Sequence, residues 1–140
     1  MNDPFALVRF VRAQSETYPQ VLAELRAGCK RSHWMWFVFP QLKELGRSFE
    51  SNFYGIASLD EAAAYLRHPL LGPRLVECTQ LVNQVEDRSI REILGSPDDL
   101  KFRSCMTLFA RAAEDDTVFC TALKKYFKGE PDPLTLELLK

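Results

Sequence analysis

The sequence lacks the features that mark membrane and secreted proteins. No apolar run approaches the roughly 20 residues that a transmembrane helix needs. The N-terminus, Met1-Asn2-Asp3-Pro4, has an acid and a proline where a signal peptide would have lysines. We therefore expect a cytoplasmic protein that neither crosses a membrane nor enters the secretory route.

The common catalytic and metal-binding motifs are also missing. There is no GxSxG elbow, phosphate loop, dinucleotide fingerprint or HExxH motif. The four cysteines form no CxxC pair, and the two histidines, His33 and His68, lie far apart, so no metal site is expected. We expect no cofactor, and free thiols in a reducing cytosol.

The sequence also lacks an excess of positive or negative charge. The net charge of the 140 residues is −1, so no global field attracts nucleic acid or an anionic membrane, and there is no strong nucleic-acid signal. A local basic rim remains around Arg26, Lys30 and Arg31. The length predicts a single helical domain over residues 1–140, with enough chain for a full core.

Proline, glycine and helix-capping residues separate the apolar segments. Apolar residues recur at helical spacing between these breaks, most clearly in the segment that Ser96-Pro97-Asp98-Asp99 begins. The pattern predicts an all-α, compact multi-helical single domain with no significant sheet. The helix starts that we expect are, in chain order, Asp3-Pro4, Pro19, Ser32, Ser48, Ser58, Pro73, Ser89, Ser96-Pro97, Val118 and Asp132-Pro133.

The stretch from Ser32 to Gln41 contains both tryptophans and six consecutive large apolar residues, Trp34 to Phe39. Its propensity alone suits a strand. We predict a short helix instead, because Ser32 is a suitable N-cap, Pro40 stops the helix and no strand-like partner exists elsewhere. The stretch is either the floor of a pocket or the centre of the core.

Lys101 is the most informative single residue for a site. Its helical angle places it on the apolar face of the clearest helix, between Leu108 and Ala112. A lysine there extends to solvent, pairs with an acid or lies in a cleft. Asp98, one turn earlier, is the expected partner. The functional alternative is a phosphate contact or an amine nucleophile.

Other polar groups near apolar residues are candidate ligand contacts. His33 is either a satisfied core histidine or a group that stacks on a ring or acts as acid or base. Gln14 lies on the inner face of the first helix, where a buried amide needs a backbone or ligand partner, and Gln41 is similar. Trp34 and Trp36 are either core residues or a stacking surface.

Nearly the whole chain resembles the bacterial and fungal family labelled "domain of unknown function 1810", sometimes named calpastatin-like. The resemblance rests on His33 to Gln41, on Tyr54 to Leu75 and on Gly95 to Lys101, and it extends to residues 107–109, 126–127 and 129–139. It implies a compact all-α fold. It brings no established activity, because the family has none.

The order of segments is also similar to the helical NAD- and ADP-ribose-associated family, NADAR. The matching pieces are residues 10–14, the helix with Lys101, Phe119 with Leu123, and residues 129–136. Members of that family act on ADP-ribosylated nucleobases or related N-glycosides. The resemblance therefore implies a small-molecule or nucleotide-like ligand, of the ADP-ribose type.

Two hypotheses follow. In the first, the protein is an N-glycosidase or a nucleotide-binding protein: Lys101 contacts phosphate or the anomeric carbon, Asp98 tunes it, and His33 is the third catalytic residue. The ligand-binding residues would be Gln14, Lys30, Trp34, Trp36 and Gln41. In the second, the protein is a non-catalytic interaction module whose aromatic stretch is core and whose basic rim contacts a partner. A cavity joining His33, Gln14 and Lys101 would favour the first hypothesis.

Overall fold

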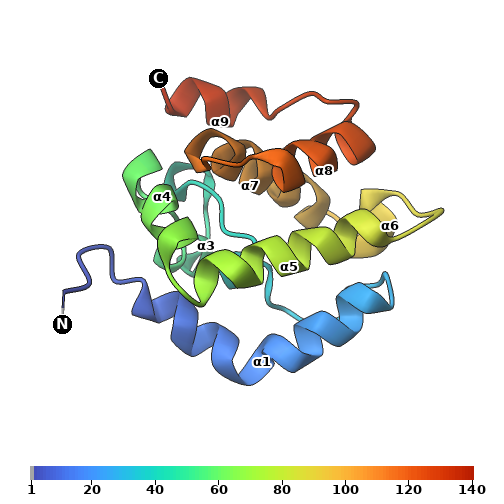
Figure 1. Cartoon of the computed structure of the whole chain (residues 1–140), viewed down its shortest axis with the longest axis horizontal. Helices are drawn as coiled ribbons and strands as arrows, with labels where there is room; N and C mark the ends of the chain where they lie inside the picture. The colour runs from blue at the N-terminus through green and yellow to red at the C-terminus, as the bar shows by residue number, and fades with distance from the viewer. Residues whose placement is uncertain (1) are drawn as a thin grey trace.

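A computed structural model describes residues 2–140, and over this range the secondary-structure elements are all helices, joined by turns and loops (Figure 1). The only extended pairing among these residues is an isolated parallel bridge between Leu42 and Ile56. The prediction of an all-α fold is therefore confirmed. The elements are α1 Val8–Arg26, α2 Met35–Val38, the 3-10 turn η1 Lys43–Leu45, α3 Phe49–Phe53, α4 Leu59–Arg67, α5 Leu71–Gln84, α6 Ile90–Leu94, α7 Asp98–Ala112, α8 Thr117–Phe127 and α9 Pro133–Leu138.

Four helix starts obey the capping rules that the sequence suggested. At each of them a side-chain oxygen at the N-cap accepts the backbone N–H three residues later, which satisfies one of the free donors of the first turn. The Ser89 cap of α6 is reciprocal, because Glu92 also accepts the backbone N–H of Ser89. The four N-cap residues are Ser48, Ser58, Ser89 and Asp132.

The predicted break at Pro19 is wrong. Pro19 lies inside α1, which continues from Val8 to Arg26 and is bent near its middle (Figure 1). A proline removes one N–H, so only the carbonyl of Ser15 loses its helical partner, and Ser15 is exposed to solvent. The predicted start at Asp3 is also early, although the Asp3 carboxylate does accept the N–H groups of Leu7 at 2.8 Å and Val8 at 3.1 Å.

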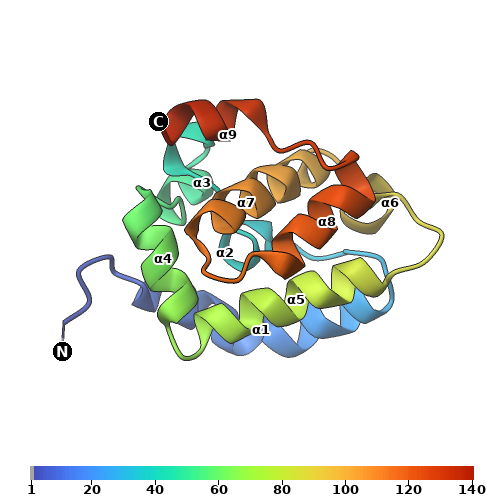
Figure 2. The same cartoon turned by 45° about the horizontal axis from the view of Figure 1, so that its top comes forward.

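Helices α5 and α7 are the two helices around which the others pack. Helix α5 contacts α1, α4 and α8, while α7 contacts α4, α6, α8 and α9. In the turned view, α1, α5 and α8 lie in successive rows, and the short α2 is enclosed behind them (Figure 2). This arrangement leaves α2 in the interior, against the inner faces of the longer helices.

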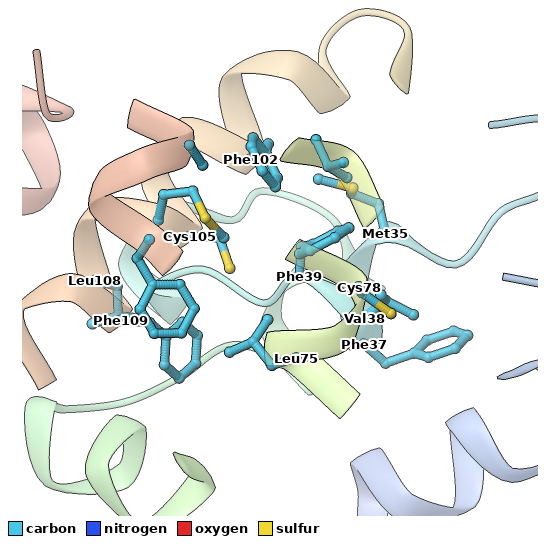
Figure 3. Close-up of a cluster of buried hydrophobic side chains, with 14 of the residues drawn as sticks. Met35, Phe37, Val38, Phe39, Leu75, Cys78, Phe102, Cys105, Leu108 and Phe109 are labelled. Atoms are coloured by element: carbon cyan, nitrogen blue, oxygen red, sulfur yellow. The ribbon is translucent and has the colours of Figure 1, made fainter. Parts of the chain in front are cut away.

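The aromatic stretch forms the centre of the hydrophobic core. Met35, Phe37, Val38 and Phe39 are each at most 8% exposed, and they converge with residues of α5 and α7 (Figure 3). Phe39 meets Phe102 edge-to-face, with ring centroids 5.0 Å apart. Each such side chain contributes about 1.5–3 kcal/mol on burial. The stretch is therefore core rather than the floor of an open cavity.

One arginine fastens the start of α1 to the segment before α4. The Arg9 guanidinium donates to the carbonyls of Phe53 at 2.7 Å and Gly55 at 2.9 Å, and to the Glu61 carboxylate at 2.7 Å. Glu61 also accepts the backbone N–H of Ala57 at 3.0 Å. Since both charged groups are largely removed from solvent and hydrogen-bonded, this pair fixes residues 53–61 on α1.

Candidate functional site

Three of the predicted site residues, Trp36, Gln41 and Lys101, share a pocket. Trp36 and Lys101 are partly exposed, and the Lys101 ammonium lies 5.7 Å from the centre of the Trp36 ring. No described residue forms an ion pair or hydrogen bond with that ammonium. The pocket has a volume of about 10 Å³, enough for about one water molecule.

Four further residues of this pocket were not predicted as site residues: Met35 and Phe39 of the aromatic stretch, and Ser51 and Tyr54. Ser51 and Tyr54 line it together with Trp36 and Lys101. They belong to the segment around α3, which folds back so that Lys43 N–H donates to Ile56 O at 2.8 Å and Ile56 N–H donates to Gln41 O at 2.9 Å. No motif marks Ser51 or Tyr54. Only the two nearby glycines hint at a close approach here.

Gly46 and Gly55 make this close approach possible. A Cβ at Gly46 would lie 2.4 Å from the Cβ of Ser51, and a Cβ at Gly55 would lie 2.5 Å from the Cα of Lys43. Both distances are far below van der Waals contact, so a side chain at either position would push the segment apart. The two glycines therefore hold Ser51 and Tyr54 beside Gln41.

Asp98 does not pair with Lys101 as expected. Its carboxylate forms an ion pair with Lys30 at 2.9 Å, and Lys30 also donates to Ser32 O at 2.6 Å and lies 5.0 Å from the Trp34 ring centre. The Lys30 side chain is 7% exposed. Lys30 is thus a buried structural cation, and the predicted basic rim is reduced to the exposed Arg26 and Arg31.

The residues before the aromatic stretch are organised by Glu24, which sequence reasoning missed. Glu24 is 4% exposed. Its carboxylate accepts the N–H groups of Arg31 at 2.7 Å and Ser32 at 2.9 Å, the Trp34 Nε1–H at 3.0 Å, and further bonds from Ser32 Oγ and Gln20. Ser32 therefore donates hydrogen bonds to Glu24 and does not cap α2, whose N-cap is Trp34.

The environment of Glu24 strongly favours its charged form. Burial opposes ionisation, but the hydrogen bonds from Ser32, Arg31 and Gln20 outweigh it and lower the pKa of the carboxyl to about 2. All of these donors are uncharged. The carboxylate is therefore stabilised by oriented dipoles, in the way that an anion is bound by a nest of N–H groups.

His33 lies between two residues that Glu24 fixes, yet its own side chain is exposed. It does not line the pocket of Lys101. Because Ser32 and Trp34 are both held by the same carboxylate, the backbone on each side of His33 is restrained. The structure therefore presents an imidazole to solvent from an ordered loop, and does not bury it.

Gln14 and Trp34 belong to the interior. Gln14 is 2% exposed, and its amide donates to Phe37 O at 2.7 Å and to the Tyr65 hydroxyl at 3.1 Å, while its oxygen accepts from Arg74 at 3.4 Å. The burial of Gln14 follows the predicted inner face of its helix. All its partners are internal, and neither Gln14 nor His33 lines the pocket of Lys101.

The remaining reactive groups form no second cluster. Among residues 2–140, no three His, Cys, Asp or Glu side chains are arranged to hold a metal ion. The four cysteines are free, and burial raises the pKa of Cys78 to about 12 and raises that of Cys105 as well. Within the same residues, no helix is both long enough and apolar enough to span a bilayer.

These features define an all-α protein with a filled aromatic core and a small pocket where the Lys101 ammonium lies over Trp36. The chain belongs to the family described as "Protein of unknown function (DUF1810)", whose model matches residues 4–139. It is similar to the conserved hypothetical protein Rv1873 from Mycobacterium tuberculosis, known from a crystal structure at 1.38 Å, with 61% identity, 98% of each chain covered and a TM-score of 0.97. No curated protein matches the chain. The comparisons do not show the resemblance to NADAR.

Proposed function

We propose that the protein binds a small anionic ligand with a planar ring, of the nucleotide class, on the face formed by Trp36, Gln41, Ser51, Tyr54 and Lys101, which we call the Lys101 face. The observation that carries this proposal is the Lys101 ammonium, which is partly buried over Trp36 and has no internal counter-ion. A cation in this position is favourable for a phosphate group, because the partial burial strengthens the attraction.

The lining of the pocket supports the same ligand class. Gln41 and Ser51 supply donors and acceptors, and the Trp36 ring is the only tryptophan surface that reaches solvent. The pocket has room for only about one water molecule, so it would take a single functional group. The planar ring of the ligand would lie outside, against exposed side chains.

Binding has more support than catalysis. An N-glycosidase of the NADAR type would use Lys101 at the anomeric carbon, with Asp98 tuning it and His33 close by. Asp98 is engaged by Lys30, and His33 does not line the pocket. The free thiols are compatible with a reducing compartment, and a cytoplasmic location remains part of the proposal.

A thermal shift series tests this proposal. We expect AMP or ADP-ribose to raise the melting temperature of the wild type, because a ligand at a hundredfold excess over its Kd adds about 2.7 kcal/mol to stability. Lys101→Met should lose the shift, and the matched control Lys124→Met, an exposed lysine of α8, should keep it. The same shift in Lys101→Met as in the wild type, or no shift with any phosphorylated nucleoside, would contradict the proposal.

A second candidate is the non-catalytic interaction module. It is favoured by the burial of the aromatic stretch and by an exposed aromatic pair on α3: Phe49 is 78% exposed and stacks on Phe53 with ring centroids 5.8 Å apart. Such apolar surface is typical of a protein interface. If this interface is homotypic, Phe49→Ser with Phe53→Ser should abolish concentration-dependent association in sedimentation velocity. A wild type that stays monomeric at all concentrations would argue against it.

A further inference from the structure

A hollow along α5 and α8 shares no lining residue with the Lys101 face. These two helices pack against each other and run side by side (Figure 2). The hollow has a volume of about 700 Å³, and a neighbouring hollow of about 350 Å³ continues it toward α4, sharing Val76 and Asp115. Together they form one groove, which we call the α5–α8 groove.

Side-chain amides and hydroxyls line this groove. Gln80, Asn83 and Gln84 come from α5, and Thr117 and Thr121 come from α8. Val76 and Val118 add the apolar part. In an all-helical protein the backbone N–H and C=O groups are used within the helices, so any hydrogen bonding to a ligand backbone falls to side chains of this kind.

Asn83 has an acceptor that the fold leaves without a donor. Its Nδ2 donates to Val118 O at 3.1 Å, which fixes the amide between α5 and α8. Its Oδ1 is buried and accepts no hydrogen bond from any described residue. A buried acceptor without a partner costs about 1–3 kcal/mol. Because this oxygen is closed off from solvent, a ligand in the groove would contact the exposed amides of Gln80 and Gln84 instead.

The spacing of the amides matches an extended chain. Gln80 and Gln84 are one turn apart, so their Cα atoms are separated by about 6 Å along the helix axis. Alternate residues of an extended peptide repeat every 6.6 Å, roughly. We propose that the α5–α8 groove binds an extended peptide segment of a partner protein, with its backbone held by the exposed amides of Gln80 and Gln84.

Charge along the groove sets the expected side chains of that peptide. Asp115 lies where the two hollows meet, and Glu114 lines the second one, opposed only by Arg67 among the lining residues. Asp115 accepts both the backbone N–H and the hydroxyl of Thr117, and these bonds hold its pKa below the usual value, so it stays ionised. The peptide therefore carries a lysine or arginine opposite Asp115.

Selection from a random dodecapeptide display library tests this inference, followed by fluorescence anisotropy with the enriched peptides. We expect sequences with a basic residue to be enriched, and Gln80→Ala with Gln84→Ala to weaken their binding by about tenfold or more. The matched control is Arg12→Ala with Glu16→Ala, an exposed pair at the same spacing on α1. Asp115→Asn keeps a side-chain oxygen that can accept the hydrogen bonds from Thr117, and it should remove the preference for a basic residue.

Two results would overturn the inference: no enriched sequence, or enriched peptides that bind the Gln80/Gln84 double variant as tightly as the wild type. The outcome is independent of the Lys101 face. Lys101→Met should bind the peptides with unchanged affinity, so failure of one proposal leaves the other intact. Circular dichroism of each variant verifies that the fold is retained, and all four substituted side chains of the double variants are exposed.

Discussion

Lys30 and Lys101 are two lysines above two neighbouring tryptophans, and they differ in what else they contact. Lys30 lies 5.0 Å from the Trp34 ring centre and is closed in by Asp98, Ser32 and, through Trp34, Glu24. Lys101 lies 5.7 Å from the Trp36 ring centre and has no counter-ion among the described residues. The cation–aromatic contact of Lys30 is therefore part of a buried cluster in which the charge is paired. The same contact of Lys101 lies on the partly exposed Lys101 face, where the charge is unpaired among the described residues.

The difference shows that proximity in a helix is a poor guide to ion pairing. Asp98 is three positions from Lys101 in α7 and 68 positions from Lys30, yet it pairs with Lys30. The loop before α2 brings Lys30 to the start of α7, where burial makes the ion pair stronger than an exposed pair on one helix face. We call the group formed by Glu24, Lys30, Ser32, Trp34 and Asp98 the closed cluster. Removing side chains from this cluster should lower the stability of the fold, and removing the Lys101 side chain should not.

The largest effect is expected from Glu24→Ala. This change leaves the Trp34 indole N–H and the N–H groups of Arg31 and Ser32 without their acceptor. We expect a loss of about 3–5 kcal/mol in the free energy of unfolding, measured in urea, because several buried donors lose their partner together. Glu16→Ala, an exposed control on the same helix, should change it by less than about 0.5 kcal/mol. Equal effects of the two changes would show that Glu24 does not organise the loop.

Acid should weaken the closed cluster in a defined range. The pKa of Glu24 is lowered from 4.5 to about 2 in the folded protein. Its contribution is therefore complete above pH 4.5 and is lost as the pH falls toward 2, by about 3 kcal/mol in total. Urea unfolding at a series of pH values should show this loss. The Glu24→Gln variant, which cannot titrate here, should show a flatter profile; an unchanged slope would assign the acid sensitivity to other carboxylates.

Lys30→Met should have a smaller effect than Glu24→Ala. Methionine preserves most of the apolar contact with Trp34 but leaves Asp98, whose side chain is 19% exposed, without its cation. We expect a loss of about 1–3 kcal/mol in the free energy of unfolding. In a double-mutant cycle, Lys30→Met and Asp98→Asn should be non-additive, because each removes the same ion pair. Additive effects would mean that the ion pair contributes nothing to stability.

The smallest effect on stability is expected for Lys101→Met. No ion pair or hydrogen bond is lost, so the free energy of unfolding should stay within about 0.5 kcal/mol of the wild type. Lys101→Met and Asp98→Asn should be additive. Ligand affinity, measured by calorimetry with whichever phosphorylated nucleoside gives a thermal shift, should fall about tenfold or more. A large loss of stability would place Lys101 in the structural cluster with Lys30.

Structural features that depend only on residues close in the chain could be predicted from the sequence. Ser48, Ser58, Ser89 and Asp132 cap their helices as expected, because a cap acts over three residues. The inner position of Gln14 followed from helical spacing in the same way. Pro19 was misplaced because a proline is compatible with a helix when the carbonyl that it frees is exposed.

The candidate site was predicted only in part, because its residues meet through tertiary contacts. Trp36, Gln41 and Lys101 share a pocket, while Ser51 and Tyr54 enter it from a segment that no motif marks. Glu24 looks like any helical glutamate in the sequence, and its role appears only when the following loop folds back over it. Long-range pairing of this kind leaves no local periodicity to read.

The attachment of Arg9 to residues 53–61 has a consequence for local opening of the structure. The segment from Leu42 to Gly55 includes only two short helical turns, so the guanidinium bonds to Phe53 and Gly55 are a large part of its connection to α1. We expect such a segment to exchange its amide protons in a smaller cooperative unit than α5 or α7. We therefore expect the segment that holds Ser51 and Tyr54 to open more often than the aromatic core unfolds, and we expect Arg9, at the start of α1, to control the frequency of that opening.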